Sequence, residues 1–347
     1  MKRPTINDVA AASGVSRATV SLVLRDSSQI SAATKERVRA AMASLGYVYN
    51  RRAADMRNRQ SRTLGLVVTT VRNPYFAELT MSIEQEAHEA GYTLLQGYSL
   101  DEVARQRRLL ESMSEHRVDG LLLIPASGSA TEDICETVVA AGIPQVLIAR
   151  SIPGYEADYV GADNVRSGEL VGRHLAALNV ASVAFLGGPL VSTARGERLN
   201  GLTSGLRAGG GEVACDVSIS ATGGQGGSEL VSTLLSAGAV PDAIVAYNDM
   251  YAFGILNGLR AHGLEPGRDV AVASFDDVPD AAAQEPALTS VAGFPEQVGT
   301  RAARLLLARL QDPVRASRRD LVTPRLVVRE STTVWTAAVS EAERNAS

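Results

Sequence analysis

The sequence predicts a small all-α head followed by a two-lobed α/β body built on doubly wound parallel sheets. The chain has 347 residues, which is too long for one compact core. From Thr63 onward, short runs rich in β-branched residues alternate with longer helical stretches, which is typical of parallel sheets with crossover helices. The first 48 residues show short, capped helical patterns instead.

The head is expected to form three short helices around a small core. Capping residues mark the start of each helix: Thr5 with Asp8, Ser16 and Ser31. Gly14 and Gly46 mark the turns that follow the first and third helices. Apolar residues recur in them at helical spacing: Ile6, Val9, Ala10, Val20, Val23, Leu24, Val38, Met42 and Leu45. These residues are enough for a core of one small domain.

The body contains strand-like runs, several of them almost continuously apolar, as buried strands of a parallel sheet are. The runs are 63–70, 92–99, 119–126, 143–149, 180–188, 241–247, 269–275 and 320–328. Stretches such as 76–91 and 166–179 are amphipathic and predict crossover helices. About 280 residues exceed a typical single sheet, so we expect two similar lobes.

Charge is divided unevenly along the chain. Residues 1–62 carry 12 Lys and Arg against 4 Asp and Glu, a balance of +8, while the whole chain has a net charge of −4. The remaining residues therefore carry −12. A basic head on an acidic body indicates an anionic partner, with nucleic acid favoured over the alternative of a solvated basic tail.

Residues 7–24 have the spacing of a helix-turn-helix, with Gly14 in the turn and the second helix starting near Arg17. If Val20 and Leu24 point inward, Arg17, Ala18, Ser21 and Leu22 point outward. Arg17 then suits a guanine edge, Ala18 and Leu22 suit apolar contact, and Ser16, Thr19 and Ser21 suit phosphates. The alternative is a purely structural helix pair.

Several other functions are disfavoured. No apolar run approaches the length of a membrane span, and the N-terminus lacks the pattern of a secretory signal, so we expect a cytoplasmic protein. Two cysteines, Cys135 and Cys215, fit a reducing compartment. We expect no metal, cofactor or catalytic residue. The segment GGQGGSEL does not complete GxGxxG, and the four histidines show no metal-ligand spacing.

The chain resembles the lactose/galactose-repressor (LacI/GalR) family of bacterial transcription regulators. The head and the following YVYNRRAADMRNRQSRTLGLVV carry the likeness. It continues in order through NPYFAEL, VDGLLLIP, GGPLVSTARGERLNG, YNDMYAFG, VASFDD, LTSV and LVVRESTT. The ordered set covers nearly the whole chain and is highly specific.

The resemblance implies a division into a DNA-binding head (1–48), a hinge helix and linker (49–62) and a two-lobed effector-binding and dimerisation body (63–340). The first lobe is expected over about 63–160 and 291–320, and the second over about 161–290 and 321–340. The body would be periplasmic-binding-protein-like, with the chain crossing between lobes three times. A homodimer would read a pseudo-palindromic operator in double-stranded DNA, and the regulator would be associated with the nucleoid when bound.

The linker corresponds to a helix that enters the minor groove, where Met56 would act as the wedge that kinks DNA. Asp55, Tyr49, Leu22 and Arg25 depart from the family pattern and put base preference in doubt. The residues expected at DNA are Thr5, Ser16, Arg17, Ala18, Thr19, Ser21, Leu22, Arg25, Ser31, Asn50, Arg51, Ala53 and Met56. The other linker arginines would anchor phosphates.

An effector site is expected where polar residues follow the strand-like runs, at the carboxyl edge of the sheets. By resemblance, the lining residues are Asn73, Phe76, Arg150, Arg195, Asn248 and Asp276. Tyr75 is added because its ring, like that of Phe76, suits an apolar face of a ligand. A carboxylate, an amide and an arginine suit a hydroxyl-rich molecule such as a sugar or related polyol. Two arginines leave an acidic or phosphorylated effector open. Asp249 and Asp277 are expected to cap helices rather than bind ligand.

The predicted function is that of a DNA-binding transcription regulator, with repression favoured over activation. A small effector would change its affinity for the operator. The sign of the effector response and activation versus repression stay open. The tail after Trp335 lacks leucine heptads, so we expect no assembly beyond a dimer. The alternative is a ligand-binding α/β protein or an enzyme acting on a sugar or nucleoside, with the basic head in another role.

Overall fold

The computed structural model describes residues 4–24, 26–47, 61–207, 209–218, 223–238 and 240–333. The chain divides into two units, residues 1–61 and 62–347, and each is described by itself. The predicted Arg25 and most of the predicted linker lie outside the described residues. None of the described helices is both long enough and apolar enough to cross a membrane.

The head contains three helices, as predicted: α1 (Ile6–Ser13), α2 (Arg17–Leu24) and α3 (Ala32–Leu45). The Thr5 amide donates to the Asp8 carboxylate at 2.7 Å, and Ser16 Oγ accepts from the Thr19 amide at 3.1 Å, so both predicted caps are present. Buried side chains form the core: Val9, Val20, Val23, Val38 and Ala41. The prediction for Leu45 was wrong, because it is 37% exposed and Ala41 faces the core from that helix instead.

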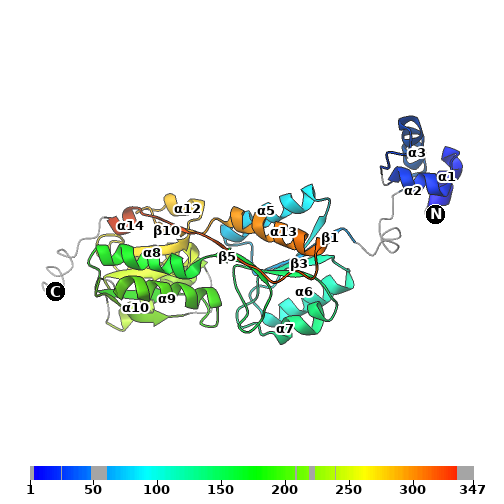
Figure 1. Ribbon diagram of the computed structural model, residues 1–347. Coiled ribbons are helices and arrows are strands. Elements are labelled where there is room, and N and C mark those ends of the chain that lie inside the picture. Colours follow the sequence, from blue (N-terminus) through cyan, green and yellow to red (C-terminus); the bar gives the residue numbers. More distant parts are fainter. Residues whose placement is uncertain are drawn as a thin grey trace. The chain divides into compact units, whose positions relative to one another are not determined.

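The first lobe of the body has a six-stranded sheet in the order β11-β5-β4-β3-β1-β2, with all neighbours parallel. Its strands are β1 (Thr63–Val68), β2 (Thr93–Tyr98), β3 (Gly120–Leu123), β4 (Gln145–Ile148), β5 (Asp158–Ala162) and β11 (Arg319–Val322). Its helical segments are α5 (Pro74–Glu89), α6 (Val103–Glu115), α7 (Glu132–Ile134), a π-helix (Cys135–Val139) and α13 (Pro295–Gln311). In Figure 1, α5 and α13 lie together over the sheet, away from α6 and α7. Apolar cores fill both faces.

The second lobe repeats this plan, with the sheet order β12-β10-β9-β8-β6-β7 and one antiparallel pair, β10 with β12. Its strands are β6 (Ser182–Leu186), β7 (Glu212–Val217), β8 (Ala243–Ala246), β9 (Ala271–Asp276), β10 (Thr289–Ala292) and β12 (Arg325–Val327). Its helices are α8 (Asn164–Ala177), α9 (Thr193–Arg207), α10 (Gly223–Ser236), α11 (Asp249–Ala261), α12 (Pro279–Ala282) and α14 (Glu330–Thr333). Two helix pairs, α8 with α9 and α10 with α11, pack around one large core.

The chain passes between the lobes three times, as the resemblance implied. It leaves the first lobe after β5, returns after β10 and leaves again after β11. The polar residues that follow β1, β4, β8 and β9 therefore lie at sheet edges that face the junction between lobes.

Three strands escaped the sequence prediction, and one predicted strand proved to be two. The missed strands are β5, β7 and β10, and of these β7 alternates in burial. The run 320–328 splits into β11 and β12, which belong to different sheets. Pro324 separates them, and proline has no amide hydrogen for a sheet ladder. The strands β5, β10 and β11, after which the chain changes lobe, end at Ala162, Ala292 and Val322.

Two glycines let α8 and α9 approach backbone to backbone. A Cβ atom at Gly168 would lie 2.0 Å from the Arg198 carbonyl oxygen, and one at Gly201 would lie 1.9 Å from the Val165 carbonyl oxygen. Only glycine fits such contacts. The contact fixes the position of α9, which carries Arg198 into the junction.

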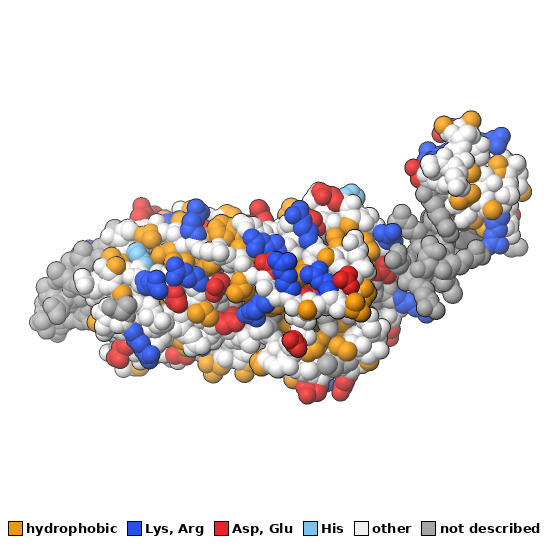
Figure 2. Space-filling view, viewed as in Figure 1, with side chains coloured by type: hydrophobic (Ala, Val, Ile, Leu, Met, Phe, Trp, Pro, Cys, Tyr) orange, Lys and Arg blue, Asp and Glu red, His pale blue; other side chains and the backbone are white. Residues whose placement is uncertain are grey.

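Charges of both signs are interspersed on the face of the body seen in Figure 2. Charged side chains on helices of the body pair with one another, as do Arg166 and Glu169 within α8 and Arg304 of α13 with Glu86 of α5. Such pairs on exposed helices contribute little to stability. The mixed pattern contrasts with the excess of positive charge in the sequence of the head.

Candidate effector cavity and DNA-reading helix

A narrow cavity of about 30 Å³ lies at the junction of the two lobes. The first lobe contributes Asn73, Tyr75, Phe76, Ala149, Arg150 and Ala162 to its lining. The second lobe contributes Asn164, Ala194, Arg198, Tyr247, Asn248 and Asp276. Six of the seven predicted residues are thus brought together. A cavity of this size holds a few water molecules at most, so a larger ligand enters only when the lobes part.

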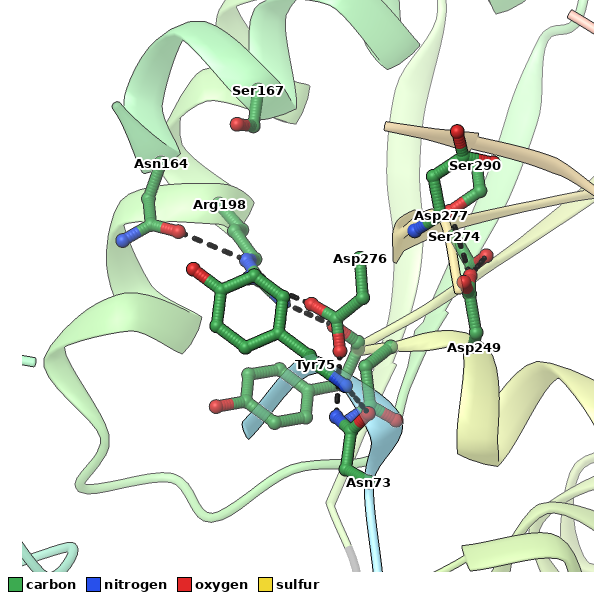
Figure 3. A network of polar contacts seen from close by, with 12 residues as sticks. Asn73, Tyr75, Asn164, Ser167, Arg198, Asp249, Ser274, Asp276, Asp277 and Ser290 are labelled. Atoms are coloured by element: carbon green, nitrogen blue, oxygen red, sulfur yellow. Dashed lines mark hydrogen bonds and ion pairs between the residues drawn. The ribbon is translucent and has the colours of Figure 1, made fainter. Parts of the chain in front are cut away.

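Asn73 and Asp276 join the lobes inside this cavity. Asn73 caps α5 through its Oδ1 atom, which accepts from the Tyr75 amide at 3.0 Å. Its Nδ2 atom donates to Asp276 Oδ2 at 2.7 Å (Figure 3). Asp276 ends β9 with φ 107°, a backbone conformation that is rare for residues other than glycine and costs energy. Burial raises the pKa of this carboxyl.

Arg198 approaches Asp276 from the other side (Figure 3). Its Nη2 atom lies 3.4 Å from Asp276 Oδ1, its Nε atom donates to Asn164 Oδ1 at 3.0 Å, and its Nη1 atom donates to the Tyr247 carbonyl at 2.7 Å. The guanidinium also lies 4.8 Å from the centre of the Phe275 ring. Asp276 therefore lies between an amide donor and a guanidinium donor.

Tyr75 and Phe76 supply an aromatic corner. Their rings meet edge to face, with centroids 5.5 Å apart. Tyr75 is 6% exposed, and burial raises the pKa of its hydroxyl, which therefore stays protonated. Asn248 caps α11, because its Oδ1 atom accepts from the Tyr251 amide at 3.3 Å. Together these groups offer apolar ring faces beside polar donors and acceptors.

The expectation for Arg195 is not met, because this side chain does not line the cavity. It is buried at the ends of β6 and β7 in the second lobe, where its Nε atom donates to the Gly187 carbonyl at 2.8 Å. Its guanidinium pairs with Asp216 and lies 5.0 Å from the centre of the Phe185 ring. Arg198, three residues later on α9, occupies the place expected for it. The sequence offered both arginines on one predicted segment and no signal to choose between them.

Asp249 and Asp277 do not line the cavity, but neither is the helix cap that was expected, since Asn248 caps α11 and the N-cap position of α12 is Val278. Asp249 is fully buried beside it and accepts from Ser274 Oγ, from Ser290 Oγ at 2.7 Å and from the Val278 amide at 2.8 Å. Burial, with Asp276 nearby, raises the pKa of Asp249 to about 7. Asp277 pairs with Arg329 at 2.7 Å instead.

The sequence prediction also missed Asn164, Tyr247 and Asp101. Asn164 follows β5, a strand that was not predicted. Tyr247 directly precedes the predicted Asn248 and was assigned to the strand itself. Asp101 follows β2 and reaches Arg150, with its Oδ1 atom 2.5 Å from Arg150 Nη1. Tyr247 and Asp101 stand just past the ends of β8 and β2, but that position alone does not reveal their roles, and without β5 there was no such signal for Asn164.

In the head, α2 presents the residues expected at DNA. Arg17 and Ala18 are exposed, Thr19, Ser21 and Leu22 are partly exposed, and Val20 is buried. Ser31 caps α3, where its side chain accepts from the Thr34 amide at 3.3 Å. Five of the residues expected at DNA lie outside the described residues: Arg25, Asn50, Arg51, Ala53 and Met56.

Within the described part of the chain, no group of three or more His, Cys, Asp and Glu side chains gathers in a way that would hold a metal ion. The cavity instead combines a carboxylate, amides, guanidinium groups and aromatic rings. This donor set suits reversible recognition of a polar molecule that carries both hydroxyl groups and apolar faces.

Comparisons with known proteins agree with this division of the chain. Residues 5–50 match the model of bacterial regulatory proteins of the lacI family, and residues 64–313 match the periplasmic binding protein domain. The maltose regulon regulatory protein MalI of Escherichia coli K12 is 30% identical over 94% of this chain and 98% of its own. A structure of the transcriptional regulator CelR–cellobiose complex has a TM-score of 0.71 and 31% identity, covering 95% of this chain and all of that one. The lac repressor dimer bound to operator and the anti-inducer ONPF has a TM-score of 0.85 and 26% identity, covering 95% and 99%.

Proposed function

Because the chain belongs to the lacI family of bacterial regulatory proteins, a family of DNA-binding transcription regulators, we propose that its operator affinity changes when a small hydroxyl-rich effector, such as a sugar, binds between the lobes of its body. The observation that carries this proposal is the cavity, because both lobes line it and Asn73 and Asp276 join across it. A ligand that changes this junction changes how the lobes sit on each other.

The helix α2 reads the operator in the major groove. Exposed Arg17 at its first turn suits the O6 and N7 atoms of a guanine, a pairing worth about 1–3 kcal/mol of discrimination. Ala18 and Leu22 offer apolar contact to a thymine methyl, and Ser16, Thr19 and Ser21 contact phosphates. The linker residues Asn50, Arg51, Ala53 and Met56 extend this contact into the minor groove.

The regulator works as a homodimer on a pseudo-palindromic site, since two heads then read two half-sites. The lac repressor relative is a dimer on its operator. The protein acts in the cytoplasm, at the nucleoid when bound to DNA. Repression is the favoured outcome, by blocking transcription at the operator.

Effector binding is linked to DNA binding through the two lobes. A ligand that prefers one arrangement of the lobes shifts the population toward it. In a dimer this shift changes how the two linkers are held, and so changes the affinity for DNA by a coupling free energy of typically 1–3 kcal/mol. The relatives named for maltose and cellobiose support a sugar as the first class to test.

Selection of bound sequences from a randomised DNA pool tests the DNA part of the proposal. We expect a palindromic consensus, and affinity that falls steeply as salt rises. Arg17→Ala should relax one position in each half-site, while Arg37→Ala, an exposed arginine of α3, should leave the consensus unchanged. Failure to enrich any sequence would contradict the proposal.

A thermal-shift screen of sugars and polyols, followed by gel shifts with each stabilising compound, tests the effector part. Any compound that binds only the native state raises its stability. We expect at least one such compound to change the affinity for the selected operator by about 5-fold or more. Stabilising compounds that leave DNA affinity unchanged would contradict the linkage.

A further inference from the structure

The two arginines that line the cavity are each paired with a carboxylate of the chain itself. Arg150 is 9% exposed, and its Nη1 atom lies 2.5 Å from Asp101 Oδ1. The same atom donates to the Ser127 hydroxyl at 3.0 Å and to the Pro125 carbonyl at 3.2 Å. Arg150 is thus held by a carboxylate and two further acceptors of its own lobe, and it also interacts with Tyr247 of the second lobe, so it is not left to await an anion.

Asp101 is built to hold this position. Leu100 and Asp101 have consecutive positive φ angles, 52° and 62°, in the left-handed region that is costly for residues with a side chain. Both Asp101 oxygens are used on Ser127 as well, since Oδ1 accepts from its amide and Oδ2 accepts from its hydroxyl, each at 2.9 Å. Such a satisfied cluster fixes the Arg150 side chain firmly.

Arg198 is balanced in the same way on the other lobe. Its Nη2 atom lies 3.4 Å from Asp276 Oδ1, and the side chains of both residues are mostly buried, with exposures of 13% and 5%. A further carboxyl group, that of Asp249, is buried next to Asp276. The two arginines of the cavity are therefore matched by the carboxylates of Asp101 and Asp276. Asp249 is a third carboxyl group and so leaves no excess of positive charge there.

A charged effector would upset this balance. An anion buried among paired ions finds no unmatched cation, and an unpaired buried charge is costly. Hydroxyl groups can instead exchange hydrogen bonds with the paired ions without changing the charge of the site. We propose that the effector is electrically neutral, a polyhydroxylated molecule rather than its phosphate or carboxylate form, and that Asp101 is the positioning residue that sets this preference by neutralising Arg150.

This inference rests on the proposed effector site but not on any response of DNA. It is tested on the free protein, by titrating inorganic phosphate at constant ionic strength and following binding by calorimetry and thermal shift. The variants are Asp101→Asn, the double variant Asp101→Asn with Arg150→Gln, and Arg150→Gln alone. Asparagine tolerates the left-handed backbone of position 101, so the first variant keeps the turn. Glu86→Gln is the matched control. It removes the carboxylate partner of the exposed Arg304, and neither residue lines the cavity.

We expect the wild type, Glu86→Gln and Arg150→Gln to bind phosphate with equal affinity. Any weak binding to the basic head is the same in all of them, because none of these changes lies in the head. Asp101→Asn should bind it about 10-fold more tightly or better, and the double variant should return to the wild-type level. A loss of folding would not move binding in this direction. The proposal is overturned if the wild type binds phosphate through Arg150, so that Arg150→Gln weakens it, or if Asp101→Asn shows no gain. Should Asp101→Asn not fold, the comparison of wild type with Arg150→Gln still decides.

Discussion

Asn73 and Asp276 lie 203 residues apart in the chain, yet their side chains form a 2.7 Å hydrogen bond that joins the two lobes. A second link spans the same junction, where Thr193 Oγ1 accepts from the Ser151 amide at 3.2 Å and donates to its carbonyl at 3.1 Å. A third link is the ion pair of Arg319 on β11 with Glu197 on α9, at 3.3 Å. A hydrogen bond to a charged acceptor contributes about 1.5–3 kcal/mol.

Asn73→Ser should loosen this junction while keeping α5 capped, because serine caps helices but is too short to reach Asp276. We expect amide hydrogen exchange of Ser151 to become about 10-fold faster or more, since its amide is released as the lobes part. Asn257→Ser, at an exposed position of α11, should leave this exchange unchanged. Equal exchange in Asn73→Ser and wild type would show that the bond does not hold the lobes together.

Arg198 and Arg195 should separate into a ligand residue and a structural residue. Arg198→Ala should abolish stabilisation by the screened sugars and leave operator binding intact, since its donors face the cavity.

Arg195→Ala should lower the free energy of unfolding by about 2 kcal/mol, because it removes a buried arginine from Asp216, which is itself about a third exposed. Urea unfolding and thermal shift distinguish the two. A fully stable but unresponsive Arg195→Ala would reverse the assignment.

The sequence predicted the architecture well because it depends on local signals. Capping residues such as Thr5 and Ser31 and the apolar runs of the parallel strands were visible in the chain. The strand β7 was not, since it lies at a sheet edge and its burial alternates between exposed and half-buried residues. The choice between Arg195 and Arg198 depends on how α9 is rotated against α8, and that rotation is set by tertiary contacts at Gly168 and Gly201. Asp101 was missed because its role depends on a left-handed turn that no motif announces.

The close contact of α8 and α9 should make Gly201 irreplaceable. Gly201→Ala places a Cβ atom 1.9 Å from the Val165 carbonyl oxygen, so the helices must separate, at a cost of about 3 kcal/mol or more. Gly196→Ala on the same helix is the matched control, because no atom lies within 4 Å of its Cβ position. There alanine should raise stability by about 0.5–1 kcal/mol through helix propensity. Chemical unfolding measures both, and equal effects would contradict the packing described.

Asp249 should make the stability of the body fall as pH rises from about 4 to about 7. Its pKa is raised from the ordinary value of 3.8 to about 7 in the folded protein, so the folded state binds a proton that the unfolded state has already released. Below pH 4 both states are protonated and the group contributes no pH dependence. Between pH 4 and pH 7 each increase in pH favours the unfolded state.

Asp249→Asn cannot titrate, and its difference in stability from the wild type should therefore change across this window and level off above about pH 7. Thermal unfolding at several pH values measures that difference, and a constant value from pH 4 to 7 would contradict the raised pKa. Asp280→Asn, an exposed carboxyl of α12, provides the comparison for the general effect of removing a negative charge.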